Sequence, residues 1–199
     1  DIKIICKDKL ELDLLSRESC FKVIRDNRPD WIINCAAYTN VDKAEEEKEL
    51  AYKVNSLAPK FLSEAIKNYG GDLLQISTDY VFDGKKNTPY NPSENKSPIC
   101  SYGFTKAKGE DFIYETLSGL DKGNIIRTSW LMSSYGNNFA LKMIQKLKSH
   151  NKLKIIYDQL GSPTTANTLA YACWKTIILK NKGEKLPPIM HFTNSGVAS

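Results

Sequence analysis

A tyrosine and a lysine lie four positions apart at Tyr102 and Lys106, within the stretch SPICSYGFTKAKGE (97–110). Residues four apart in a helix lie on one face, about one turn from each other. An ammonium group stabilises a neighbouring phenolate and lowers the pKa of the tyrosine, which makes the phenol a better proton donor near neutral pH. The pair therefore suits the reduction of a ketone, in which the developing alkoxide needs a proton as hydride arrives.

The spacing alone does not identify the pair, because Tyr171 and Lys175 repeat it. With 10 tyrosines and abundant lysine in the chain, about one such match is expected by chance. Only the first copy closely follows hydroxyl side chains at a predicted strand end, Ser77 and Thr78. A threonine hydroxyl can hydrogen-bond the same carbonyl oxygen and stabilise negative charge on it. We therefore interpret the first copy as a catalytic pair and the second as part of an ordinary amphipathic helix.

Short apolar runs alternate with helical patterns along the chain, and these elements must position the reactive side chains. Apolar strands that alternate with helices predict an α/β fold, a doubly wound parallel sheet of the Rossmann-like type, in a single domain over 1–199. Such sheets bind their ligands at the carboxyl ends of the strands. The predicted strands are 2–6, 31–37, 72–77, 124–130, 153–157 and 189–193, and the predicted helices are 16–27, 47–70, 99–117, 138–149 and 165–180.

The composition is that of a globular protein, with 41% apolar residues and a net charge of +5. The lysines are dispersed and mixed with acidic residues, which argues against a nucleic-acid partner. No apolar run reaches the length of a membrane span. The five cysteines are far apart, so free thiols in a reducing, cytoplasmic compartment are expected, and no metal site is predicted.

Six segments together resemble the dTDP-4-dehydrorhamnose reductase family of extended short-chain dehydrogenase/reductases. The resemblance implies reduction of the C4 ketone of dTDP-4-dehydro-6-deoxy-L-mannose to dTDP-L-rhamnose, with NADPH or NADH as cofactor. It also implies a dTDP-sugar as the substrate partner, and a homodimer is a further possibility. The segments are NCAAYTNVDKAE (34–45), STDYVFDG (77–84), SPICSYGFTKAKGE (97–110), RTSWL (127–131), GNNFALKM (136–143) and DQLGSPT (158–164).

The same resemblance implies a role for each matching residue. Tyr102 would be the proton donor, Lys106 its electrostatic partner and a ribose ligand, and Thr78 the third catalytic group. Besides Tyr102 and Lys106, the residues implied near the cofactor are Asp13, Leu14, Ala36, Ala37, Asn55 and Ser129. Those implied to face the sugar nucleotide are Thr39, Val41, Tyr80, Phe82, Trp130 and Asn138.

The sequence departs from the family pattern at both ends. No Gly-x-x-Gly-x-x-Gly phosphate loop occurs in the 199 residues, although such a loop normally holds the cofactor pyrophosphate. The run 2–6 resembles the second strand of the family, and 158–199 would only begin the smaller substrate-binding portion. We therefore expect the chain to be part of a longer protein, to bind NADPH poorly by itself, and to carry the activity of that intact parent.

Other readings stay open at this point. A related sugar-nucleotide epimerase or 4,6-dehydratase would use an acidic group beside the catalytic threonine, and Asp79 occupies that place. A non-catalytic regulatory subunit, similar to that of methionine adenosyltransferase, would keep the fold for protein binding. Individually, Asp13 could be a solvated turn residue, Asn55 a helix interruption, and Phe82 and Trp130 core aromatics.

Overall fold

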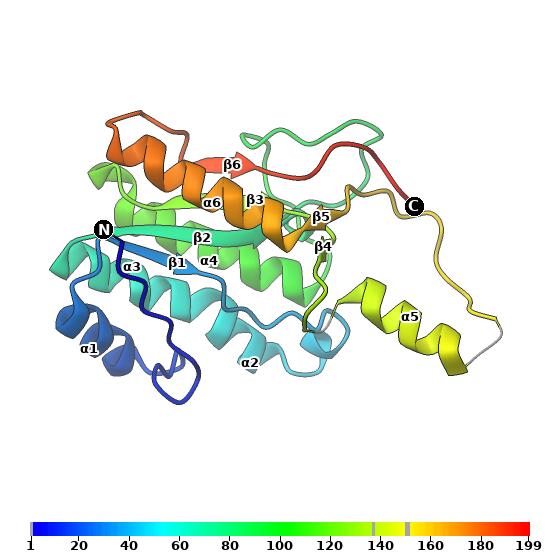
Figure 1. Ribbon diagram of the computed structural model, residues 1–199, viewed down its shortest axis with the longest axis horizontal. Coiled ribbons are helices and arrows are strands. Elements are labelled where there is room, and N and C mark those ends of the chain that lie inside the picture. Colours follow the sequence, from blue (N-terminus) through cyan, green and yellow to red (C-terminus); the bar gives the residue numbers. More distant parts are fainter. Residues whose placement is uncertain (1, 137, 150–151) are drawn as a thin grey trace.

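The computed structural model describes residues 2–136, 138–149 and 152–199 (Figure 1). Its main sheet has four parallel strands in the order β1-β2-β3-β6. A second, two-stranded parallel sheet pairs β4 with β5. The predicted parallel α/β class is confirmed. The strands are β1 (Trp31–Asn34), β2 (Asp72–Thr78), β3 (Asn124–Thr128), β4 (Leu131–Met132), β5 (Thr164–Thr165) and β6 (Ile189–His191).

Helices cover both faces of the main sheet (Figure 1). They are α1 (Arg17–Asn27), α2 (Lys48–Tyr52), α3 (Ala58–Tyr69), α4 (Ser101–Leu117), α5 (Phe139–Ser149) and α6 (Ala166–Asn181). Short 3₁₀ turns lie at Lys43–Glu45, Asp79–Val81 and Ser118–Leu120. Within the described part of the chain, no helix has both the length and the apolar character that a bilayer span requires.

The core follows from the alternation of side chains along the strands, which places successive residues on opposite faces. Leu73 and Ile125 pack with residues of α1, α3 and α4 on one face. Leu74 and Ile126 pack with residues of α6 on the other. The helix α5 extends away from this sheet in Figure 1, and none of its residues is buried.

The C-terminal third contributes directly to the main sheet. The helix α6 packs on one face through Leu169 and Cys173, and β6 pairs with β3. The expected change at residue 158 to a smaller substrate-binding portion stays a prediction.

The helix predicted over 47–70 forms with a change of winding in its middle. Between α2 and α3, residues Lys53–Leu57 form a π-helical turn, a wide form that often occurs at functional sites. Asn55 lies in this turn, and its amide pairs with the backbone of Tyr38, accepting from N at 2.8 Å and donating to O at 3.0 Å. It also donates to the Thr105 Oγ1 of α4 at 3.1 Å. The turn therefore joins α4 to the segment that follows β1.

Two predicted strands were wrong. The runs 2–6 and 153–157 have no strand structure, and Ile2, Ile4 and Ile156 are 75%, 68% and 67% exposed. An apolar run becomes a strand only where a neighbouring strand accepts and donates its backbone hydrogen bonds. Among the described residues, neither run has such a neighbour. The strands predicted over 31–37, 124–130 and 189–193 are present but end earlier, and β4 and β5 were not predicted.

Candidate active site

Three strand ends meet at one edge of the main sheet, because neighbouring strands are parallel and in register. Thr78 of β2 lies beside Thr128 of β3, and Ser77 lies beside Arg127. Asn34 ends β1, and its Oδ1 accepts from the Ala36 N–H at 3.2 Å. The loop after β2 then leads to α4, which begins at Ser101 and carries Tyr102 and Lys106. The predicted catalytic residues thus come from β2 and α4.

The phenol of Tyr102 lies beside the hydroxyl of Thr78. Burial raises the pKa of Tyr102 to about 12, and the Thr78 side chain acts in the opposite direction. The ring of Tyr80 contacts the Tyr102 ring edge-on, with centroids 5.5 Å apart. The prediction that Lys106 lowers the pKa of Tyr102 was wrong: in this structure burial raises that pKa, and the group that lowers it is Thr78 rather than Lys106. Tyr102 therefore holds its proton at neutral pH.

The hydroxyl of Thr78 is oriented by its own neighbours. It donates to Asp79 Oδ1 at 3.0 Å and accepts from the Tyr80 backbone N–H at 3.2 Å. Burial raises the pKa of Asp79, and the bond from Thr78 lowers it. The Thr78 proton is therefore directed at Asp79 in this structure.

Lys106 is buried, with 5% of its surface exposed, and its Nζ donates to the backbone oxygen of Ile76 at 2.7 Å. Burial lowers the pKa of Lys106 to about 8, whereas the negative charge of Glu110 raises it. A buried ammonium of this kind is costly unless it has a function or a partner.

Replacement of Lys106 by methionine is expected to stabilise the fold by roughly 1–3 kcal/mol at pH 7. The folded-state pKa of about 8 lies below the ordinary value of 10.5, so folding opposes protonation of this lysine. The gain is therefore full below pH 8, declines between pH 8 and pH 10.5, and is absent above it. Urea unfolding across this pH range measures the effect. The exposed Lys175→Met is the control, and an equal change in both variants would contradict the prediction.

The residues predicted near the cofactor take different positions. Ala36 and Ala37 follow β1 at the carboxyl edge, and Ser129 follows β3, where its Oγ donates to Ser162 O at 2.8 Å. Asp13 lies in a turn in which its carboxylate accepts from the Leu15 N–H at 2.9 Å, and Leu14 packs on the core beside α1. Their assignment to the cofactor stays a prediction.

The residues predicted to face the sugar nucleotide are also dispersed. Tyr80 lies beside Tyr102, and Thr39 and Val41 lie in the segment after β1. Phe82 is buried and stacks on Tyr90 with ring centroids 4.3 Å apart. Asn138 precedes α5, where its Oδ1 accepts from the Leu141 N–H at 3.1 Å. Its contacts are therefore those of a helix cap.

Trp130 follows β3 with a left-handed backbone, φ +43°. This conformation is uncommon for a bulky residue, and such outliers gather at functional sites. Gly161 packs against the indole so closely that an added Cβ would lie 2.5 Å from Trp130 Cε2. The absence of a side chain at Gly161 therefore makes room for this ring.

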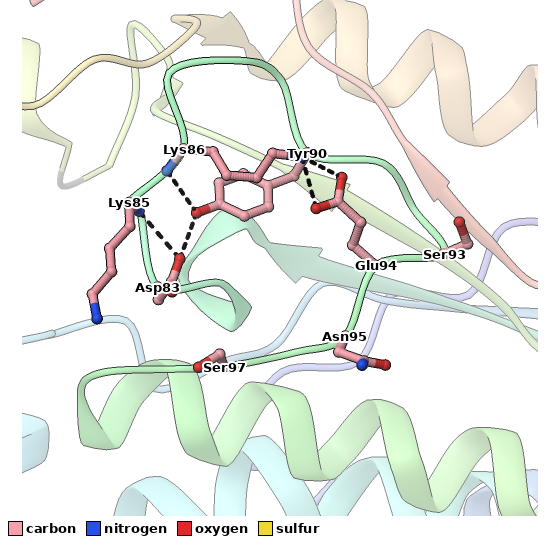
Figure 2. A pocket seen from close by; sticks show the side chains of 8 residues that line it. All are labelled: Asp83, Lys85, Lys86, Tyr90, Ser93, Glu94, Asn95 and Ser97. Carbon is pink, nitrogen blue, oxygen red and sulfur yellow. Dashed lines mark hydrogen bonds and ion pairs between the residues drawn. The ribbon is translucent and has the colours of Figure 1, made fainter.

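A pocket of about 520 Å³ lies in the loop between β2 and α4 (Figure 2). Its polar groups pair with one another: Lys86 with Glu94, and the Tyr90 hydroxyl with Asp83 at 2.6 Å. Thr78, Tyr102 and Lys106 do not line it, so we place the chemistry at the strand ends instead. The lining residues are Asp83, Lys85, Lys86, Tyr90, Ser93, Glu94, Asn95 and Ser97.

One buried residue near this site was missed by the sequence interpretation. Glu110 is 1% exposed and pairs with Arg127 of β3. Its position four residues after Lys106 was a usable signal, because Tyr102, Lys106 and Glu110 are spaced to share one helical face.

The sheet, its two helical layers and the polar groups at its carboxyl edge define a Rossmann-like α/β domain. A family model described as "RmlD substrate binding domain" matches residues 1–199. The chain belongs to this family.

Similar proteins are consistent with that family. A dTDP-4-dehydrorhamnose reductase from Sinorhizobium fredii is 38% identical over 201 residues, which cover 100% of this chain and 67% of that protein. A crystal structure of a dTDP-4-dehydrorhamnose reductase from Clostridium acetobutylicum has a TM-score of 0.90 at 39% identity, covering 98% of this chain and 66% of that one. The Bacillus anthracis reductase in complex with NADP has a TM-score of 0.86 at 38% identity, covering 99% and 68%. The chain spans 56–67% of the length of the curated relatives it matches.

Proposed function

We propose that the protein containing this chain reduces the C4 ketone of dTDP-4-dehydro-6-deoxy-L-mannose to dTDP-L-rhamnose, with Tyr102 as the proton donor. The observation that carries the proposal is the meeting of the Tyr102 phenol with the Thr78 hydroxyl, one helical turn from the buried Lys106. The relatives at 38–39% identity that are named as reductases of this sugar nucleotide support the substrate.

The proposed proton transfer follows from the state of the phenol. With a pKa of about 12, Tyr102 is protonated at neutral pH, and an alkoxide is basic enough to take that proton. Thr78 can turn its hydroxyl from Asp79 to the substrate oxygen and stabilise the same negative charge. In this proposal Lys106 then stabilises the phenolate that remains.

We propose NADPH or NADH as the cofactor, which supplies hydride when bound. The donor set at the carboxyl edge fits such a group. Ala36 and Ala37 leave the backbone open to a flat ring, and the Lys106 ammonium suits ribose hydroxyls. The buried Thr128 Oγ1 has no hydrogen-bond partner among the described residues. Asn55 would act indirectly, because its amide is committed to the Tyr38 backbone and to Thr105.

The alternatives carry less support. Asp79 lies beside Thr78, as an epimerase or dehydratase would require, but the relatives at 38–39% identity are named reductases. The presence of Thr78, Tyr102 and Lys106 together also argues against a purely regulatory subunit. A homodimer stays a prediction.

The test is NADPH oxidation by the full-length protein with dTDP-4-dehydro-6-deoxy-L-mannose, followed by identification of the sugar product. We expect oxidation that depends on the sugar nucleotide and yields dTDP-L-rhamnose. If neither NADPH nor NADH supports turnover of this sugar nucleotide, the proposal is wrong. Cofactor released by denaturing the purified protein would instead favour an epimerase, which retains it tightly.

A further inference from the structure

The carboxylate of Glu110 is the centre of a buried polar cluster behind the candidate active site. It accepts from Ser77 Oγ at 2.5 Å, and from Arg127 Nε at 3.0 Å and Nη2 at 2.7 Å. Lys96 lies 3.5 Å from its second oxygen. Helix α4, strands β2 and β3, and the loop before α4 therefore meet at one side chain.

The partners of Glu110 are themselves held in place. Arg127 is 3% exposed, donates to Pro92 O at 3.3 Å and lies 3.4 Å from His191 Nε2. Lys96 also donates to the backbone oxygen of Ala107 and pairs with Asp111. A buried bidentate pair with further hydrogen bonds fixes geometry more than it adds stability.

Side chains from three successive turns of α4 contact β2 within the short stretch from Ile76 to Thr78. Tyr102 interacts with Thr78, Lys106 donates to Ile76 O, and Glu110 accepts from Ser77 Oγ. Movement of Ser77 along the strand would carry Thr78 with it, because the two residues share a peptide unit. A displacement of about 1 Å in such a group can lower a rate by about a hundredfold.

We propose that Glu110 is a positioning residue of the reaction: it anchors Ser77, and with it the Thr78 hydroxyl, opposite Tyr102, and it supplies the buried negative charge that faces Lys106. This inference rests on the proposed function. It assigns to Glu110 no contact with the substrate or the cofactor.

The charge of Glu110 acts on Lys106 in a defined direction. Burial lowers the pKa of Lys106, while Glu110 and, more weakly, Cys35 raise it. The groups that face Glu110 are Ser77 of β2, Arg127 of β3, His191 of β6 and Lys96 of the loop. Loss of the Glu110 charge is therefore expected to lower the pKa of Lys106 further. The ammonium is then lost at a lower pH.

The experiment compares Glu110→Gln, Glu110→Asp and Ser77→Ala with the wild type in the full-length protein. We expect Glu110→Gln to lower kcat by roughly 10- to 100-fold with little change in KM for the sugar nucleotide. The high-pH limb of its kcat profile moves to lower pH, and Glu110→Asp restores part of both effects. Ser77→Ala keeps the charge, so kcat falls but the limb does not move. Glu115→Gln, at an exposed position of the same helix, behaves like the wild type.

A second measurement does not depend on the reaction. Isotope-edited NMR follows the titration of the Lys106 side chain, identified by its loss in Lys106→Met, and we expect a lower midpoint in Glu110→Gln. A folded Glu110→Gln protein with unchanged kcat, pH limb and Lys106 midpoint would overturn the proposal. If Glu110→Gln does not fold, an unchanged kcat in Ser77→Ala overturns the positioning role. If the wild type lacks turnover, the proposed reductase function is wrong, whatever the role of Glu110. In that case a Lys106 titration midpoint that is the same in Glu110→Gln and in the wild type still overturns the electrostatic role of Glu110.

Discussion

Tyr102→Phe is expected to lower turnover by about 10²- to 10⁴-fold, because it removes the proton that the proposed reaction delivers. The ring and its edge-on contact with Tyr80 remain. Burial disfavours the charged form of the phenol, and the substitution replaces the phenol by an apolar group of nearly the same shape. The free energy of unfolding should therefore change little. Sugar-dependent NADPH oxidation and urea unfolding measure the two effects.

The chain provides its own control in the second Tyr-x-x-x-Lys. Tyr171 is 70% exposed on α6, so Tyr171→Phe should retain full turnover. Wild-type turnover in Tyr102→Phe, or an equal loss in both variants, would show that the phenol at position 102 is not the proton donor.

Gly109→Ala is expected to destabilise the fold by roughly 3 kcal/mol or more, at the upper end of overpacking effects. A Cβ at this position would lie 2.2 Å from the backbone oxygen of Asn55 in the π-helical turn. A backbone atom cannot rotate away as a side chain can, so α4 would have to separate from the turn. Because Gly109 lies between Lys106 and Glu110, turnover should fall together with stability.

Gly119→Ala is the matched control for this substitution. No atom lies within 4 Å of an added Cβ there, and the backbone is not left-handed. Its unfolding midpoint in urea should stay close to the wild-type value. A Gly109→Ala protein as stable as Gly119→Ala would mean that α4 and the π-helical turn do not approach as closely as described.

The sequence predicted the fold well where apolar runs had neighbours. The runs that became β1, β2, β3 and β6 each pair with a neighbour in the sheet. The equally apolar runs at 2–6 and 153–157 have no neighbour among the described residues and form no strand. Hydrophobic periodicity shows which side chains of a segment can be buried, whereas a strand also needs a pairing partner that lies far away in the sequence. For the same reason, the π-helical turn around Asn55 could not be read from local spacing.

The candidate site was predictable only in part. The order of Thr78, Tyr102 and Lys106 could be read from the motifs, and the structure places Thr78 beside Tyr102. The contacts of Asn55 with Tyr38 and Thr105, and of Glu110 with Ser77 and Arg127, join residues 17 to 50 positions apart. Such pairs arise from strand register and helix packing, which a single sequence does not contain. The left-handed backbone of Trp130 likewise leaves no mark in the residue type.

The wide turn at Lys53–Leu57 limits how the length of this protein can vary. Removing one of its five residues would restore regular winding and leave α2 and α3 in nearly the same phase, because a π-helical turn takes up about one residue more than an α-helical turn. The Asn55 amide would then lose its position between the Tyr38 backbone and the Thr105 hydroxyl. We therefore expect that substitutions are accepted in this turn more readily than any single-residue deletion, although the turn itself departs from ideal helical geometry.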